Sequence, residues 1–207
     1  MATLVLGSEA VWDDGHRGEL RAVVIDPAAG TLTHLVVEPE GRRGLARLVP
    51  AGLADAAAGQ LRLRCTEAEF QELDAAEQTL AEFALGYQFP VQLLPPGWRD
   101  AGGPTVAGGT IPRIPEKETI DVVPPGEVAE HRGGQVYASD GPIGELRAVR
   151  IDPASHQVTD LLVREGHALA HKEVAIPYGA VAGFDDGIRL RITRQQVRDL
   201  PRADADR

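Results

Sequence analysis

Length, composition and charge exclude several classes of protein. The chain has 207 residues, of which 43% are hydrophobic, with one cysteine and a formal net charge of −10. A single cysteine forms no internal disulfide, and an acidic total disfavours nucleic-acid binding. No apolar run reaches the roughly 18 to 20 residues of a membrane span, and the N-terminus does not resemble a signal peptide. We therefore expect a soluble, cytoplasmic protein.

The acidic charge belongs to the middle of the chain. Residues 1–66 carry 7 basic and 8 acidic side chains, and residues 128–207 carry 11 and 12. Residues 67–127 carry 3 basic and 11 acidic side chains, which accounts for most of the net charge. The two ends are therefore nearly neutral.

The first predicted strand is irregular. It belongs to DGHRGELRAVVIDPA, residues 14–28, in which Leu20, Val23 and Ile25 break the two-residue period of a strand. A β-bulge between Leu20 and Val23 would restore that period, and bulges help small sheets to curl into barrels. Asp26 and Pro27 then predict a turn in which the Asp carboxylate accepts free backbone N–H groups.

The next strand, TLTHLVVE, alternates as expected for a strand with one buried face, so that Leu35 and Val37 should point into the core. Farther along, Thr66 followed by Glu69 fits a helix capping box. The apolar pattern after Thr66 extends through Phe70 and Leu73 to Leu80 and Phe83, which leaves open a long or a broken helix.

Residues 86–127 are rich in Pro and Gly, and we interpret them as an irregular acidic linker. Their apolar residues are too numerous for a purely solvated tether. Part of the linker should therefore pack on the rest of the chain.

The C-terminal part repeats the N-terminal part. DGPIGELRAVRIDPA, residues 140–154, matches residues 14–28 at 12 of 15 positions. The match continues through a second strand, a Pro-terminated strand at 175–177 and a capping box at Thr193 and Gln196. We predict two tandem domains, 1–85 and 128–207, separated by the linker 86–127.

These residues resemble a known family. The order G-x-x-[VW]-x-x-D-G-x-x-G-E-L-R-A-V-x-I-D-P, then a strand, a V-P or I-P strand end and L-x-L-x-x-T before a helix, is similar to the PRC-barrel family. That family includes the cytoplasmic domain of the photosynthetic reaction-centre H subunit and the C-terminal domain of a ribosome-maturation factor. The resemblance implies a mainly β chain with two small PRC-type β-barrels, each closed by a short helix. It also implies protein binding or scaffolding, since most known members have such roles.

The charged residues shared by the repeats are the first candidates for a contact surface. Glu19 and Arg21 recur as Glu145 and Arg147. They form either ion pairs inside each barrel or a duplicated partner-binding surface. Asp26 and Asp152, by contrast, are expected to be structural turn residues.

Two outward strand positions, Val36 and Leu162, are apolar in both repeats. The terminal helix, the other barrel or a protein partner would have to cover them. We favour a pseudo-twofold packing of the two barrels through equivalent surfaces, with the linker wrapped across them, and keep both residues as candidate partner contacts.

Other chemistry finds little support in the sequence. His167 and His171, with Asp185 and Asp186 nearby, are weak candidates for metal ligands, because the two histidines fall in a predicted loop that fixes no helical spacing. Cys65 aligns with Ile192 and is expected to be a small buried hydrophobe. Motifs of serine hydrolases, P-loops and Rossmann folds are missing from the sequence.

The sequence therefore predicts a non-enzymatic interaction or scaffold module with no cofactor, with an unidentified protein partner or a second copy of itself. A small-molecule or metal-binding sensor is the alternative. A weaker third possibility is a nucleic-acid role through the outward arginines of the LRLR and IRLR strands, at positions 62, 64, 189 and 191.

Overall fold

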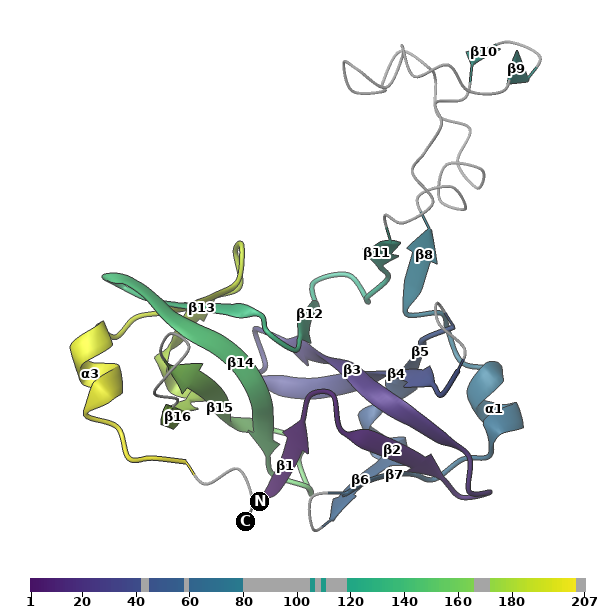
Figure 1. Cartoon of the computed structure of the whole chain (residues 1–207), viewed down its shortest axis with the longest axis horizontal. Coiled ribbons are helices and arrows are strands. Elements are labelled where there is room, and N and C mark those ends of the chain that lie inside the picture. The colour runs from purple at the N-terminus through teal and green to yellow at the C-terminus, as the bar shows by residue number, and fades with distance from the viewer. Residues whose placement is uncertain are drawn as a thin grey trace. The chain divides into compact units, whose positions relative to one another are not determined.

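A computed structural model describes residues 1–41, 45–57, 60–79, 105–106, 109–110, 119–165 and 172–203. It is mainly β, as the sequence predicts, and divides into two compact units. One unit comprises Met1–Ala76 together with Val123–Arg207, and the other comprises Glu77–Val122. The two ends of the chain therefore belong to a single unit (Figure 1).

Each repeat builds a strongly bent sheet with the same strand order. The first sheet has the order β5-β4-β3-β2-β7-β6 and the second β16-β15-β14-β13-β18-β17, with the parallel contact between β2 and β7 repeated between β13 and β18. The first sheet comprises β2 (Glu9–Trp12), β3 (Arg17–Asp26), β4 (Thr31–Pro39), β5 (Arg47–Pro50), β6 (Ala54–Ala57) and β7 (Gln60–Leu63). The second comprises β13 (Gln135–Ala138), β14 (Gly141–Ile151), β15 (Val158–Glu165), β16 (Lys172–Pro177), β17 (Val181–Gly183) and β18 (Ile188–Leu190).

Short helices recur at equivalent places. A 3-10 turn follows the Pro-terminated strand in each repeat, as η1 (Ala51–Leu53) and η3 (Tyr178–Ala180). A five-residue helix then ends each repeat, as α1 (Glu67–Gln71) and α3 (Arg194–Arg198), and both predicted capping boxes are present. The first helix ends at Gln71, so it does not continue through Leu73 as a long helix would. Leu80 and Phe83 lie outside the described residues.

The two repeats exchange their first strands. β1 (Ala2–Val5) pairs with β14 of the second repeat, and β12 (Val128–His131) pairs with β3 of the first (Figure 1). The registers are equivalent, because Ala2 faces Ile151 just as Val128 faces Ile25. Each repeat thus completes its sheet with a strand from the other repeat.

A second symmetric contact joins the two strand-turn-strand units. The Leu32 N–H donates to the carbonyl of His156 at 2.9 Å, and the Val158 N–H donates to the carbonyl of Gly30 at 2.9 Å. Thr31 and Gln157 form the bridge between these two bonds. These reciprocal bonds confirm the predicted packing through equivalent surfaces, and strand exchange adds a continuous backbone connection to it.

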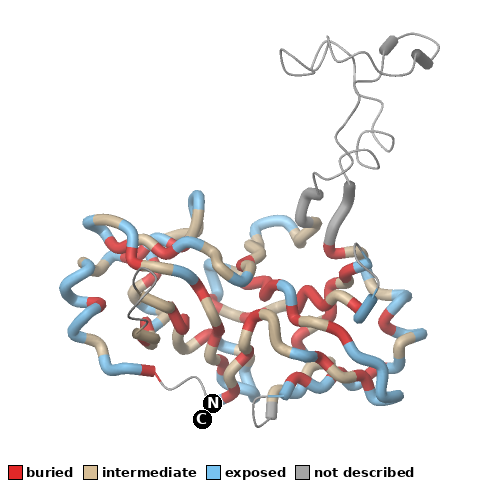
Figure 2. Tube along the Cα trace, in the orientation of Figure 1, coloured by how far each residue is buried: buried red, intermediate tan, exposed pale blue. Residues whose placement is uncertain are grey.

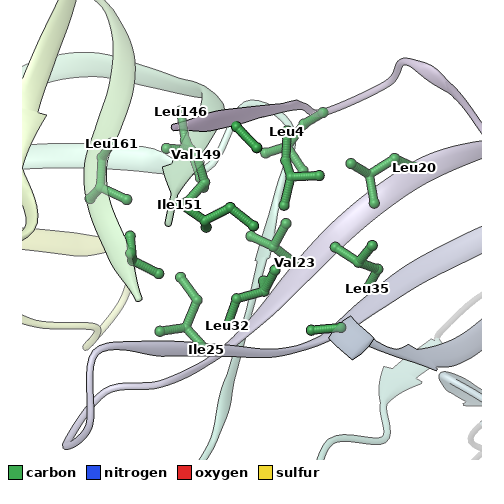
Figure 3. Packing of buried hydrophobic residues seen from close by; sticks show 14 of the residues in the cluster. Leu4, Leu20, Val23, Ile25, Leu32, Leu35, Leu146, Val149, Ile151 and Leu161 are labelled. Carbon is green, nitrogen blue, oxygen red and sulfur yellow. The ribbon is translucent and has the colours of Figure 1, made fainter. Parts of the chain in front are cut away.

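One hydrophobic core runs through both repeats. Leu4 and Leu20 of the first repeat belong to the same buried cluster as Leu146 and Ile151 of the second (Figure 3). Buried positions follow the inner faces of both sheets, whereas the turns at the ends are largely exposed (Figure 2). The repeats therefore share their main apolar interior, and a smaller buried cluster accompanies it in each repeat.

The predicted strand details are confirmed. The pairing of β3 with β4 shifts register between Leu20 and Ala22, and that of β14 with β15 shifts between Leu146 and Ala148, which are the predicted bulges. The alternating residues expected to point inward are fully buried, namely Leu35, Val37, Leu161 and Val163. The period of two thus becomes regular once each bulge is counted.

The division of the chain differs from the predicted 1–85, 86–127 and 128–207. The unit that contains both repeats ends at Ala76 and continues from Val123. Strand exchange places the two repeats in this one compact unit. In the second unit, β8 (Glu77–Thr79) pairs with β11 (Thr119–Asp121), and β9 (Thr105–Val106) pairs with β10 (Gly109–Thr110). Most of the predicted linker, and any wrapping of it, lies outside the described residues.

Candidate functional site

A charged cleft of about 880 Å³ lies on the first repeat and contains two of the sequence-predicted site residues, Glu19 and Arg21. It is formed where β2, β3 and β4 meet. Its lining is Gly7, Glu9, Arg17, Gly18, Glu19, Arg21, Glu38, Pro39, Glu40 and Gly41.

Glycine at position 18 allows the strands beneath the cleft to approach closely. A Cβ added to Gly18 would meet the carbonyl oxygen of Glu38 and the ring of Trp12. At the equivalent Gly144, a Cβ would collide with the backbone of Arg164. The shared G-E-L-R segment therefore has a packing reason for its glycine in both repeats.

The charges inside the cleft pair with each other. Arg17 contacts Glu9 at 2.7 Å, while Arg21 lies between Glu19 and Glu38, with nitrogen-to-oxygen distances of 3.4 Å to each. Because Glu19 faces Glu38 across the strands, the guanidinium group separates two carboxylates that would otherwise repel. Arg21 and Glu19 are each 45% exposed, so these pairs orient the side chains and add little stability.

In the second repeat, the residue opposite the shared glutamate carries a positive charge in place of a negative one. Arg164 replaces Glu38 as the cross-strand neighbour, and it contacts Glu145 at 3.9 Å. Partial burial lowers the pKa of Arg147, as do the positive charges of Arg164 and Arg132. The structure therefore brings Glu19 together with Arg21, whereas Glu145 pairs with Arg164.

A residue of the second repeat contacts Gly7, one of the residues that line the cleft. The side chain of Arg132 lies over Gly7, whose Cβ position would be 2.6 Å from the Arg132 Nη1 atom. Gly7 has a φ of +86°, in the left-handed region where a side chain would be strained. The sequence did not single out Arg132, because its equivalent in the first repeat is the buried Leu6.

The chain itself covers Val36 and Leu162, which are 3% and 0% exposed. Val36 belongs to an apolar cluster that includes Ala76 after the first helix and is joined by Ala129 of the exchanged β12. Leu162 belongs to the matching cluster with Ala203, joined by Val5 of the exchanged β1. Neither side chain is accessible to a partner in this structure, so their apolar character follows from intramolecular packing.

Asp26 and Asp152 have the predicted structural role. The Asp26 carboxylate accepts the Ala28 N–H at 2.8 Å, and the Asp152 carboxylate accepts the Ala154 N–H at the same distance. These hydrogen bonds lower the pKa of Asp152. In a similar way, Asp14 and Asp140 each accept a backbone N–H from the first residue of a helix, which explains the Asp of the D-G turn.

Cys65 is buried, and desolvation raises the pKa of its thiol, as expected of a small hydrophobe. His167 and His171 lie outside the described residues. Within the described ranges, no group of three His, Cys, Asp or Glu side chains is arranged to hold a metal ion.

The outward arginines of the last strand in each repeat make local contacts. Arg62 pairs with Asp13 at 3.2 Å, and Arg64 donates to the carbonyl of Gly52. Arg189 stacks over the ring of Tyr137 at 4.3 Å, and Arg191 donates to the carbonyl of Val181 at 2.7 Å. Their guanidinium groups thus have roles within the barrels.

The comparisons with known proteins bear on the second repeat. The family model of the PRC-barrel domain matches residues 127–197, from the residue before β12 to Val197 in α3. Residues 127–197 are a PRC-barrel domain. The match begins with the exchanged strand, so the first strand of this PRC-barrel domain is the one that pairs with the first repeat. No curated protein matches the chain.

Among the described residues, the structure contains no helix long and apolar enough to cross a membrane.

Proposed function

We propose that the chain is a non-enzymatic interaction or scaffold module in which residues 1–76 form a second PRC-barrel repeat. The internal sequence repeat, the common strand order and the equivalent registers of the exchanged strands support the duplication. Protein binding is a frequent role of PRC-barrel domains, and we extend it to this chain.

The charged cleft carries the proposal. The charged residues that the two repeats share at their most similar segment, Glu19 and Arg21, lie at this cleft. Its charged lining residues include carboxylates and guanidinium groups that pair as Arg17 with Glu9 and Arg21 with Glu19 and Glu38, which suits recognition of a charged protein surface. Exposed ion pairs contribute little to the free energy of folding, so a partner can replace one member without a large loss of stability.

The proposed contact surface extends to the matching region of the second repeat, around Glu145 and Arg147. There the replacement of Glu38 by Arg164 makes the surface more basic than its counterpart. The two regions would therefore bind different parts of a partner, or acidic and basic surfaces of two copies of this chain.

The experiment is an affinity capture from lysate of the source organism with the full chain as bait. We compare the unchanged protein with an Arg21→Gln, Arg147→Gln variant. A matched Arg62→Gln, Arg189→Gln variant removes the same charge from another pair of strands. We expect one stoichiometric protein, or a second copy of the chain, to be lost only with the first variant, while circular dichroism shows that both variants fold.

Equal capture by both variants would remove the cleft from the proposal. Failure to capture a partner, together with a monomer on size-exclusion chromatography, would contradict the scaffold role. The sensor alternative has one structural observation in its favour, a cavity between the repeats.

A further inference from the structure

A cavity of about 220 Å³ lies where the two repeats meet, away from the charged cleft. Its wall presents both polar and apolar surface, with contributions from the exchanged strand β1, from β4 and from the second repeat, and it opens to water beside Asp55, Arg64 and Pro153. Asp55, Arg64 and His156 are its polar members. The lining is Ala2, Leu4, Leu32, Leu35, Ala51, Ala54, Asp55, Ala56, Arg64, Ile151, Pro153 and His156.

The equivalent place in the other half of the molecule holds a tyrosine. Ala51 and Tyr178 are matching residues, since each is the first residue of the 3-10 turn after a strand-ending proline. Tyr178 packs against the core, and its hydroxyl donates to the carbonyl of Pro27 at 3.4 Å. Its ring also lies against Gly30, where an added Cβ would come within 2.8 Å of it.

Part of the cavity wall matches the surroundings of that tyrosine. Pro153 matches Pro27, and Ile151 matches Ile25 in the 12-of-15 repeat. Ala51 in place of Tyr178 removes a phenol ring beside these shared wall residues. The other repeat therefore serves as a partial template for what fits.

Size and charge favour a small neutral aromatic molecule. An apolar protein cavity of about 150 Å³ is large enough to bind benzene. The 220 Å³ here allows one ring with a small substituent. Asp55 and Arg64 carry opposite charges, so their sum gives the cavity no preference for an ion.

The template differs from the cavity at several wall positions, of which position 156 lies closest to the tyrosine ring. His156 stands where Gly30 lies in the other half, so a ring in the cavity must lie farther from position 156 than Tyr178 lies from Gly30. The imidazole of His156 would be a polar and aromatic neighbour of a ring bound in the cavity. Because position 156 narrows the cavity on that side, single rings fit better than fused ones.

We propose that this cavity is a binding site for a single-ring phenol, whose ring replaces the missing tyrosine side chain and whose hydroxyl donates to the carbonyl of Pro153. This inference does not rest on the proposed protein binding, since the cavity and the charged cleft share no residue. It gives the sensor alternative a definite class of ligand.

The test is a titration of the isotope-labelled full chain with phenol and with toluene, followed by amide chemical shifts. We expect phenol to shift the signals of Ala51, Ala54, Ile151 and His156, with a dissociation constant on the order of 0.1–1 mM for so small a ligand. Toluene, which lacks the hydroxyl, should bind about five- to tenfold more weakly, as for the loss of one hydrogen bond.

Ala51→Tyr should abolish these shifts, because its ring would occupy the space that phenol takes, farther from position 156 than Tyr178 lies from Gly30. The matched control is Gly179→Tyr, which adds the same side chain at a position open to solvent and should leave binding unchanged. If Ala51→Tyr does not fold, Ala51→Leu fills part of the space and should weaken phenol binding at least tenfold with an otherwise unchanged spectrum.

No shift at the cavity residues with phenol would overturn the proposal, and so would shifts that persist in Ala51→Tyr. Equal binding of phenol and toluene would overturn the assigned hydrogen bond to Pro153. An aromatic side chain of a partner protein would be the next occupant to consider if phenol fails to bind.

Discussion

The two repeats share a backbone but fill their interiors differently. In the first repeat, Trp12 and Phe70 pack edge to face with ring centroids 4.9 Å apart. Their equivalents in the second repeat are Ala138 and Val197, which are much smaller. The second repeat instead has Tyr178 where the first has Ala51.

This comparison shows what duplication preserves. Backbone features such as the bulge, the Asp-Pro turn and the capping box recur in both copies, because they define the sheet and its closure. Side-chain volume is free to move between positions as long as the shared core stays filled. The two copies are therefore expected to be most sensitive to substitution at different positions.

The largest expected effect is in the aromatic pair of the first repeat. Phe70→Ala should reduce the free energy of unfolding by about 3–5 kcal/mol, because it removes a buried ring and leaves a cavity against Trp12. Val197→Ala, at the matching position, should cost only about 2 kcal/mol. Urea denaturation of both variants checks the difference, and equal losses would show that the two interiors carry similar energetic weight.

A smaller and pH-dependent effect is expected at Glu130. This residue is buried where the other repeat has Leu4, and desolvation raises its pKa to about 7 from the ordinary 4.5 of a glutamate. Between these values the folded state holds the proton more tightly than the unfolded state, so stability falls as the pH rises from about 4.5 to 7. Above pH 7 the cost is complete, at up to about 3 kcal/mol.

Glu130→Gln should therefore raise stability at pH 8 and change it little at pH 4. Glu130→Leu copies the equivalent residue and should stabilise the protein at both values. Thermal unfolding across this pH range measures the effect. An unchanged pH profile in Glu130→Gln would mean that Glu130 titrates as an exposed carboxyl.

The smallest expected effect concerns the helix caps, in which the repeats are alike. Thr66→Ala and Thr193→Ala each remove a hydroxyl that accepts the N–H of the third helical residue, at 3.3 Å in both repeats. Each substitution should cost about 1 kcal/mol. Because the geometry is the same, the two losses should agree within about 0.5 kcal/mol in parallel urea titrations, and a clear inequality would contradict the equivalence of the two helices.

Local features were predictable from sequence, and long-range partners were not. The period of two and its break at Leu20 locate the bulge, and the Thr66 pattern locates the cap, because both depend on neighbouring residues. The partner of β1 cannot be predicted in this way. Its two possible neighbours, β3 and β14, belong to nearly identical sequences, so the local pattern does not distinguish them.

The candidate site was partly predictable for the same reason. The shared motif singled out Glu19 and Arg21, which do line the cleft. It did not indicate Arg132, which contacts Gly7 of the cleft, since the two first strands have little sequence similarity. The functional interpretation of Val36 and Leu162 overlooked the exchanged strands that help to cover them. The cavity between the two repeats depends on the arrangement of both repeats, which no single motif encodes.

The exchange of first strands is the central claim, and disulfide trapping tests it most directly. In a Cys65→Ala background, Thr3→Cys is combined either with Arg150→Cys, its partner on β14, or with Val24→Cys, the partner it would have without exchange. Directly opposed antiparallel residues lie about 4.5–5.5 Å apart at Cα, within reach of a disulfide. We predict rapid cross-linking within the monomer for Thr3 and Arg150 and none for Thr3 and Val24, and the reverse result would show that each repeat keeps its own first strand.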